Sequence, residues 1–349
     1  MASVSSAGKS FVRRSSRDRS QTLRRAWQLG FLTLNVWMGG QFYLWVRGIE
    51  RESAAAGASR PAGIEGYLPI AGLMNLKYWV ASGELPKIHP AAMFLFVAIC
   101  GSALLLRKAF CSWLCPVGTV SEGLWRAGRK LFGRNWMPPR VVDVPLRGVK
   151  YLLLAFFVWA VSLMSAGAIE QFMGTAYGLG LDVKMLDFFR RLSGAGLVIL
   201  LLLASASLFV KNSWCRYGCP YGALLGILAV FSPLSVRREK ERCIDCAMCA
   251  KACPAALPVD ELVTIRSAEC TGCLECTAAC PADGTLQMTA GVGTRARFVP
   301  AWVVAVGVAM ILLGTVAGVK LAGHWESAIS NSQYRQLITH ANEAIHPAP

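Results

Sequence analysis

Cysteine is the residue type in this chain whose spacing most directly predicts chemistry. The chain has 13 cysteines, and all but Cys100 fall into four short motifs. Two consecutive motifs have the pattern Cys-x2-Cys-x2-Cys-x3-Cys-Pro: Cys243, Cys246, Cys249 and Cys253 before Pro254, then Cys270, Cys273, Cys276 and Cys280 before Pro281. Three thiolates in a tight loop can bind three irons of one cubane, whereas structural zinc sites use pairs of Cys-x2-Cys. The spacing therefore predicts two [4Fe–4S] clusters and argues against zinc and disulfides.

The same spacing predicts which cysteines share a cluster. In two-cluster ferredoxins the fourth cysteine of each run binds the cluster of the other run. We therefore expect one cluster on Cys243, Cys246, Cys249 and Cys280, and a second on Cys270, Cys273, Cys276 and Cys253. Crossed ligation keeps the two clusters close together, which suits electron transfer. Segment 235–297 is too small to rely on a hydrophobic core, so the clusters should contribute to its folding.

Two further motifs have the pattern Cys-x3-Cys-Pro-x-Gly, over Cys111–Gly118 and Cys215–Gly222. Each motif follows an apolar run, and the matching flanks indicate an internal repeat. The repeat would bring four thiols together at the inner membrane surface: Cys111, Cys115, Cys215 and Cys219. These thiols could bind a metal, form a redox disulfide or remain packed and reduced, and the sequence leaves the three alternatives open.

The composition predicts that membrane helices position these motifs. Hydrophobic residues make up 54% of the chain and charged residues 16%. A transmembrane helix needs about 20 apolar residues. Five runs meet or approach this length: Trp27–Val46, Pro90–Leu106, Val149–Ala168, Ala195–Val210 and Phe298–Leu321. We therefore expect a mainly α, polytopic membrane protein with about five transmembrane helices and an inserted small α+β ferredoxin domain of the bacterial two-cluster type.

The distribution of charge predicts the orientation in the membrane. The net charge is +16, and Lys and Arg cluster beside the apolar runs, as the positive-inside rule requires of cytoplasmic segments. This placement favours a bacterial inner-membrane protein over a nucleic-acid-binding one. The predicted domains are a basic cytoplasmic arm (1–26), a four-helix membrane core with both Cys-x3-Cys-Pro motifs (27–234), the ferredoxin-like domain (235–297), and a fifth helix with a periplasmic tail (298–349). All four cysteine motifs then lie on the cytoplasmic side.

The combination of motifs resembles the NapH/MauN/NosR-like membrane polyferredoxins and the oxidase assembly proteins of the CcoG/RdxA type. Segment Gly66–Trp79, with Ile88–Ala91, is especially similar to the membrane core of the nitrous-oxide-reductase accessory proteins. The resemblance implies quinol-linked electron delivery toward a periplasmic redox enzyme, or maturation of such an enzyme.

We therefore expect an electron-transfer subunit rather than a stand-alone enzyme, and no catalytic residue is predicted. It would relay electrons between the quinone pool and a partner redox enzyme, in contact with membrane lipid. The alternative is a maturation factor that supplies electrons for metal or cofactor insertion into another oxidoreductase. His89 and Glu65 could frame a quinol pocket, but anchoring at the membrane interface is the favoured interpretation.

Overall fold

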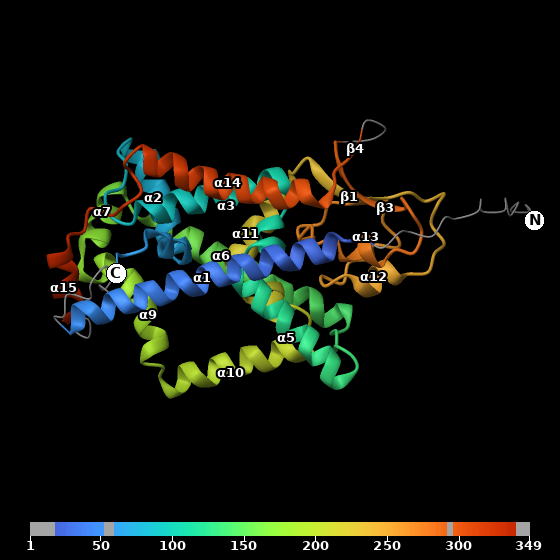
Figure 1. The fold of residues 1–349 in the computed structure, drawn as a ribbon, viewed down its shortest axis with the longest axis horizontal. Helices are drawn as coiled ribbons and strands as arrows, with labels where there is room; N and C mark the ends of the chain where they lie inside the picture. The colour runs from blue at the N-terminus through green and yellow to red at the C-terminus, as the bar shows by residue number, and fades with distance from the viewer. Residues whose placement is uncertain (1–17, 52–58, 292–295, 340–349) are drawn as a thin grey trace, which may run out of the picture.

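Long helices run along the longest axis of the molecule, and a small sheet lies at one end (Figure 1). The computed structural model describes residues 18–51, 59–291 and 296–339. The first 17 residues of the basic arm and residues 340–349 of the tail lie outside these ranges. The described end of the arm is helical, because the first helix begins at Ser20.

The helical part consists of the elements before the sheet and two helices, α14 and α15, after it. Its elements are α1 (Ser20–Glu50), η1 (Ala62–Tyr67), α2 (Pro69–Ser82), α3 (Pro90–Leu106), α4 (Ala109–Trp113), α5 (Pro116–Phe132), α6 (Arg140–Leu163), α7 (Ala166–Gly174), α8 (Ala176–Leu179), α9 (Leu181–Arg190), α10 (Gly194–Phe209), η2 (Trp214–Gly218), α11 (Pro220–Val230), α14 (Ala301–Leu321) and α15 (Asn331–Thr339). Proline opens α2, α3, α5 and α11, where its missing N–H costs no helical hydrogen bond.

Helices form over all five predicted spans, but they differ in their capacity to cross a membrane. In the described part of the chain, α6 and α14 are long and apolar enough to span a bilayer, and α9 with α10 would form a third span bent by 82°. The shorter α3 has 17 residues. The 31-residue α1 is long enough, but polar residues such as Gln28, Asn35 and Gln41 lower its hydropathy. Two or three spans are therefore supported, and five remains a prediction.

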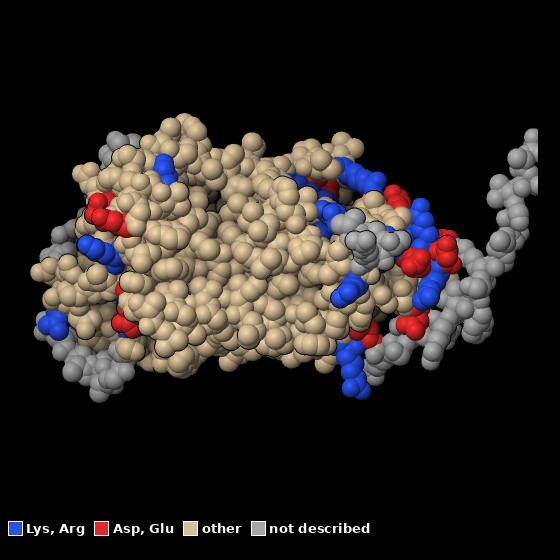
Figure 2. Space-filling view, turned by 90° about the horizontal axis from the view of Figure 1, so that it is seen from above, with Lys and Arg blue, Asp and Glu red and all other residues tan. Residues whose placement is uncertain are grey.

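The surface is consistent with a membrane protein. Figure 2 shows charged side chains at both ends of the molecule, with a broad band between them that carries neither sign of charge on the visible face. Large apolar side chains such as Leu152 and Leu202 are 72% and 64% exposed on α6 and α10. Apolar exposure of this extent on long helices suits contact with lipid.

The sheet is antiparallel, with strand order β2-β1-β3-β4. Its strands are β1 (Leu234–Arg238), β2 (Thr264–Ile265), β3 (Leu286–Ala290) and β4 (Arg297–Phe298), and two short helices, α12 (Met248–Ala252) and α13 (Glu275–Ala279), lie between them in the chain. Val236 of β1 pairs with Ile265 on one side and with Met288 on the other. These three side chains are each 1% exposed and belong to a core that also contains Trp113 and Leu225 of the helical part. The sheet and the helices therefore share one hydrophobic core.

Candidate iron–sulfur centres

The two ferredoxin-type cysteine loops adopt the same backbone conformation. The third and fifth residues of each loop have positive φ: Asp245 and Ala247 in the first loop (both 54°), Gly272 (64°) and Leu274 (59°) in the second. Left-handed residues are uncommon outside glycine, and they cluster where a backbone must turn its N–H groups toward a bound group. The repeated conformation therefore indicates two loops shaped around a ligand.

The predicted first ligand set lines one cavity, which we call site 1. Its lining contains Cys243, Cys246, Cys249 and Cys280. The Arg238 guanidinium donates to the Cys243 sulfur (3.4 Å). Cys246 is exposed, so site 1 lies close to the surface of the molecule.

The predicted second ligand set lines a separate cavity, site 2, which contains Cys253, Cys270, Cys273 and Cys276. Its other walls are mostly apolar and include Val236, Leu257 and Ile265. Burial raises the pKa of the Cys273 thiol to about 12. Such a thiol loses its proton readily only when a metal takes the place of that proton.

Sites 1 and 2 are neighbours. Helices α12 and α13 pack together, and Cys249 of site 1 interacts electrostatically with Cys276 of site 2. Within the described ranges, no three or more His, Cys, Asp or Glu side chains gather tightly enough to hold a single metal ion. The thiols instead surround cavities, and a cubane, which spreads its ligands over four irons, fits this donor arrangement.

The first helix fastens the loop of site 2. Gln21 donates to the Cys273 carbonyl oxygen (2.9 Å). Arg24, which is 1% exposed, pairs with Glu122 of α5 (2.7 Å) and with Glu275 of α13 (2.6 Å). Burial alone would raise the pKa of Glu122, but the hydrogen bond from Arg24 holds it below its ordinary value. This network was not predicted, because no local pattern marks ion pairs between distant segments.

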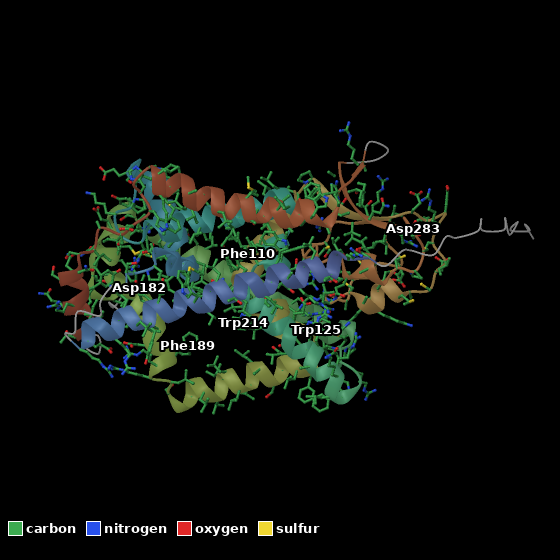
Figure 3. All side chains as sticks on the ribbon, viewed as in Figure 1. Phe110, Trp125, Asp182, Phe189, Trp214 and Asp283 are labelled. Atoms are coloured by element: carbon green, nitrogen blue, oxygen red, sulfur yellow. The ribbon has the colours of Figure 1, made fainter. Side chains whose placement is uncertain are left out.

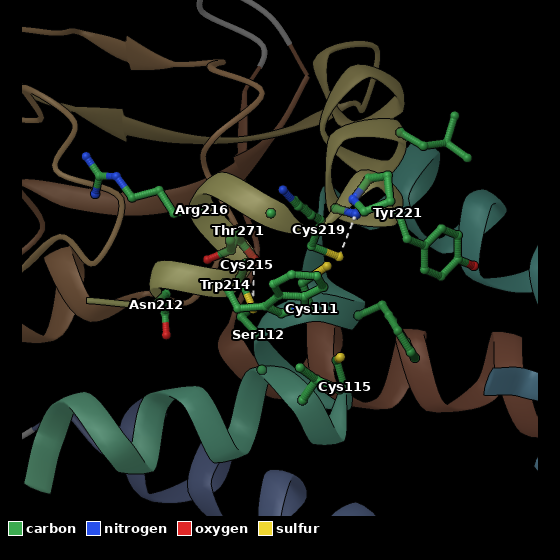
Figure 4. A pocket seen from close by; sticks show the side chains of 18 of the residues that line it. Cys111, Ser112, Cys115, Asn212, Trp214, Cys215, Arg216, Cys219, Tyr221 and Thr271 are labelled. Carbon is green, nitrogen blue, oxygen red and sulfur yellow. Dashed lines mark hydrogen bonds between the residues drawn. The ribbon is translucent and has the colours of Figure 1, made fainter. Parts of the chain in front are cut away.

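The four remaining motif cysteines line a single cavity of about 630 Å³: Cys111, Cys115, Cys215 and Cys219. Figure 4 shows these side chains around the cavity, together with Trp214 and Tyr221. All four thiols interact electrostatically with one another. The convergence that the repeat predicted is therefore present, and we call this space the four-cysteine cavity.

The second cysteine of each Cys-x3-Cys-Pro motif is the N-cap residue of a helix. Cys115 precedes α5 and Cys219 precedes α11, and each is followed by proline. Their backbone N–H groups donate five residues back, to Phe110 (2.8 Å) and Trp214 (3.0 Å). The N–H of Gly222 donates to the Cys219 sulfur (3.2 Å). The two loops therefore share one design, with a thiol at the positive end of a helix dipole.

The four-cysteine cavity reaches site 2. Cys273 lines both cavities. Ser112 donates to the Thr271 carbonyl oxygen (2.7 Å), and the Trp113 indole donates to that of Gly272 (3.2 Å). Two hydrogen bonds therefore connect the Cys111–Cys115 loop directly to the loop of site 2.

A second polar network lies at the opposite end of the molecule, where Figure 3 labels Asp182. His89, Glu65 and Asp182 are each 0% exposed. His89 Nδ1 lies 3.1 Å from the Glu65 carboxylate, and Nε2 lies 3.0 Å from the Gly178 carbonyl oxygen. Arg60 pairs with both carboxylates (2.7 and 2.6 Å). His89 and Glu65 are therefore buried, not anchored at a membrane interface as we expected from the sequence.

Family models match the three cysteine-bearing regions of the chain. A model described as a 4Fe-4S binding domain matches residues 88–135 and again 192–239. One described as a 4Fe-4S dicluster domain matches residues 235–281. The chain thus contains iron–sulfur binding domains, and the first model covers both Cys-x3-Cys-Pro motifs.

Relatives point to electron transport. The chain is 48% identical over 323 residues to YccM of Escherichia coli, named as a candidate electron transport protein, across 92% of this chain and 90% of the relative. It is 34% identical over 179 residues to the regulatory protein NosR of Pseudomonas aeruginosa (49% of this chain, 23% of NosR). It is 27% identical over 183 residues to the ferredoxin-type protein NapH of Escherichia coli (52% and 59%). No solved structure matches the chain.

Proposed function

Because the chain belongs to the NapH/NosR-like polyferredoxin family that includes YccM, we propose that it relays electrons between the membrane quinone pool and a partner redox enzyme. The observation that carries this proposal is the series of neighbouring cysteine-lined cavities. It begins at the exposed Cys246 of site 1, continues through site 2, and ends in the four-cysteine cavity.

Two [4Fe–4S] clusters with crossed ligation would form the relay. Site 1 would hold one cluster on Cys243, Cys246, Cys249 and Cys280, and site 2 would hold the other on Cys270, Cys273, Cys276 and Cys253. The division of these cysteines between two separate cavities supports the assignment. When bound, each cluster supplies a one-electron carrier. The cysteines of this chain would hold the clusters, backbone N–H groups of the two loops would stabilise their negative charge, and the apolar walls of site 2 would limit the access of water to the inner one.

The outer and inner clusters would have different roles. The exposed cysteine of site 1 suits electron exchange with a docked partner protein, whereas the apolar walls of site 2 suit an internal carrier. Arg24 would place a positive charge beside Cys273, which the neighbouring Glu275 offsets. The partner would therefore dock at the sheet end of the molecule.

The quinone would enter the apolar end of the four-cysteine cavity. This end is lined by Ile70 and Leu73 of α2 and by Leu154 and Phe157 of α6. Pockets for small molecules are mostly apolar with few polar groups, and α6 is one of the helices apolar enough to span a membrane. Oxidation of one quinol releases two electrons and two protons, so two one-electron clusters can accept both electrons.

We further propose that the cysteine sites lie on the cytoplasmic side of a bacterial inner membrane, with the basic arm (1–26) beside them and the tail after His324 in the periplasm. The excess of Lys and Arg around the motifs supports this orientation. A reducing compartment also preserves the thiols that metal binding requires.

Anaerobic redox titration of the full chain in detergent tests the relay. A soluble quinol such as duroquinol should reduce the clusters, as followed by EPR, and dithionite defines full reduction. Replacing Leu154 by tryptophan should fill the apolar end and slow reduction by quinol without changing reduction by dithionite. Leu152→Trp is the matched control, because Leu152 is 72% exposed and does not line the cavity. Clusters that dithionite reduces but quinol does not would refute the quinone link.

Deletion of the gene separates relay from maturation. A relay predicts a partner enzyme that is fully loaded with metal but receives no electrons. A partner that is inactive and short of metal would support the maturation role instead.

A further inference from the structure

We propose that the four-cysteine cavity holds a third iron–sulfur cluster, bound jointly by Cys111, Cys115, Cys215 and Cys219. The 4Fe-4S binding model matches the chain twice, but each matched segment contributes only two cysteines to the cavity. One cubane needs four thiolates. The two repeat units must therefore share one cluster, and neither can bind one alone.

The backbone around the cavity suits an anionic sulfur cluster. The first turns of α5 and α11 direct N–H groups at Cys115 and Cys219, and the Gly222 N–H lies 3.2 Å from the Cys219 sulfur. N–H groups at a helix N-terminus stabilise negative charge.

Glycine is required at one of these caps. A Cβ on Gly118 would lie 2.4 Å from the Cys111 carbonyl oxygen, so only glycine lets the loop approach the first turn of α5. This close approach holds Cys111 beside Cys115. Both sulfurs of the first motif are thus positioned by backbone packing before any metal binds.

The cavity also supplies a positive charge. Lys108 lines it, is 4% exposed, and lies close enough to Cys111 and Cys215 to interact with both electrostatically. A cubane with four thiolates has a net negative charge, which grows by one unit when it takes up one electron. A buried cation beside the cluster offsets this charge and favours electron uptake. Lys108 is therefore a positioning and charge-compensating residue.

A third cluster completes the relay described above, and in this respect the inference rests on the proposed function. Cys273 lines both this cavity and site 2, so the third and second clusters would be direct neighbours. One electron passed from the third cluster to the second oxidises the former and reduces the latter, with no proton transferred. Without a carrier here, the apolar end of the cavity would be separated from site 2.

Iron quantification on anaerobically prepared full-length protein tests the proposal independently of quinol. Three cubanes predict about 12 irons per chain, and two predict about 8. Cys115→Ser should lower the iron content to about 8 and remove one EPR signal, while the signals of the two ferredoxin-type clusters remain. Cys100→Ser is the matched control, since Cys100 is the cysteine outside the motifs and does not line the cavity.

Lys108→Met provides a second test, whose readout is the reduction potential of the third cluster. Cysteines with a purely structural role would give no such potential to shift. This variant should keep about 12 irons and shift the reduction potential of the third cluster downward, with the other two unchanged. Wild-type protein with about 8 irons, with zinc in the cavity, or with a Cys–Cys disulfide there would overturn the third cluster. Such protein could still be reduced by quinol, so failure here and failure of the relay are distinguishable.

Discussion

Replacing Gly118 by alanine would test how tightly the first Cys-x3-Cys loop packs on α5. The new Cβ would lie 2.4 Å from the Cys111 carbonyl oxygen, and Cβ atoms are essentially never found within 3.0 Å of another heavy atom. Because that oxygen belongs to the backbone, the whole loop must move. Overpacking of this kind costs about 1–3 kcal/mol, whereas alanine in a helix gains up to about 1 kcal/mol over glycine. We expect a net loss of about 1–2 kcal/mol.

The internal repeat supplies the control for this experiment. Gly222 occupies the same position in the second motif, but there a Cβ would meet its nearest atoms at 3.5 Å, which is ordinary contact. Gly222→Ala should therefore be neutral or slightly stabilising. Gly123→Ala, on the solvent or lipid side of α5 with nothing within 4 Å, should also be tolerated.

Thermal unfolding in detergent, followed by circular dichroism, measures the difference. Gly118→Ala should lower Tm by several degrees relative to the two control variants. Iron content should be measured on the same samples, because a displaced Cys111 should weaken metal binding in the four-cysteine cavity. Equal stability of the Gly118 and Gly222 variants would show that the loop does not pack on α5 as described.

Three further predictions concern ion pairs and a helix crossing. Arg24→Gln should destabilise the protein by about 2–4 kcal/mol, because it leaves two carboxylates in a buried network without their main partner, whereas the exposed Arg25→Gln should change stability by less than about 0.5 kcal/mol. Gly128→Ala should separate α5 from α10 and lower Tm more than any other single glycine change, since its Cβ would lie 1.8 Å from a carbonyl oxygen of α10. Burial alone would lower the pKa of His89, but the hydrogen bond to Glu65 outweighs burial and raises the pKa of His89 above its ordinary 6.5. Burial alone would raise the pKa of Glu65, but the hydrogen bond to His89 outweighs burial and lowers the pKa of Glu65 below its ordinary 4.5. The stabilisation from this pair should therefore be complete between pH 4.5 and 6.5, and be lost as the pH rises through the raised pKa or falls through the lowered one.

Each of these predictions has an outcome that would contradict it. Equal Tm values for the Arg24 and Arg25 variants would show that the ion pairs add no net stability. A Gly128 variant as stable as Gly123→Ala would contradict the close helix crossing. His89→Gln should remove the alkaline limb of the Tm–pH profile, and a profile that keeps this limb would assign it to another group.

The grouping of the cysteines was predictable because ligand spacing is a local property of the chain. The two triplets of Cys-x2-Cys-x2-Cys predicted both the loops and the exchange of Cys253 and Cys280 between sites, and the structure groups the cysteines in two cavities in this way. The convergence of the Cys-x3-Cys-Pro motifs was predictable for a different reason. Each repeat unit places its Cys-x3-Cys-Pro motif after an apolar helix, at the same side of the membrane. Two such units that pack side by side bring their motifs together.

The long-range polar contacts could not be predicted. The pairing of Arg24 with Glu122 and Glu275 joins segments that no periodicity relates. His89 was interpreted as an interfacial residue because it precedes the predicted span Pro90–Leu106, and the nearby Tyr67 and Trp79 are of types enriched at membrane interfaces. Its burial depends on Glu65, Arg60 and Asp182, which compensate one another only in the folded chain.

The bond between Gln21 and the Cys273 carbonyl oxygen has a consequence for biosynthesis. These residues are 252 positions apart, so the ribosome must synthesise the chain as far as Cys273 before they can meet. Because chains are synthesised from the N-terminus, the start of α1 is made first and can form this hydrogen bond only after Cys273 has left the ribosome. Maturation of the inner centre is therefore a late event, and cells short of iron should accumulate full-length chains in which Gln21 lacks its hydrogen bond to the Cys273 loop.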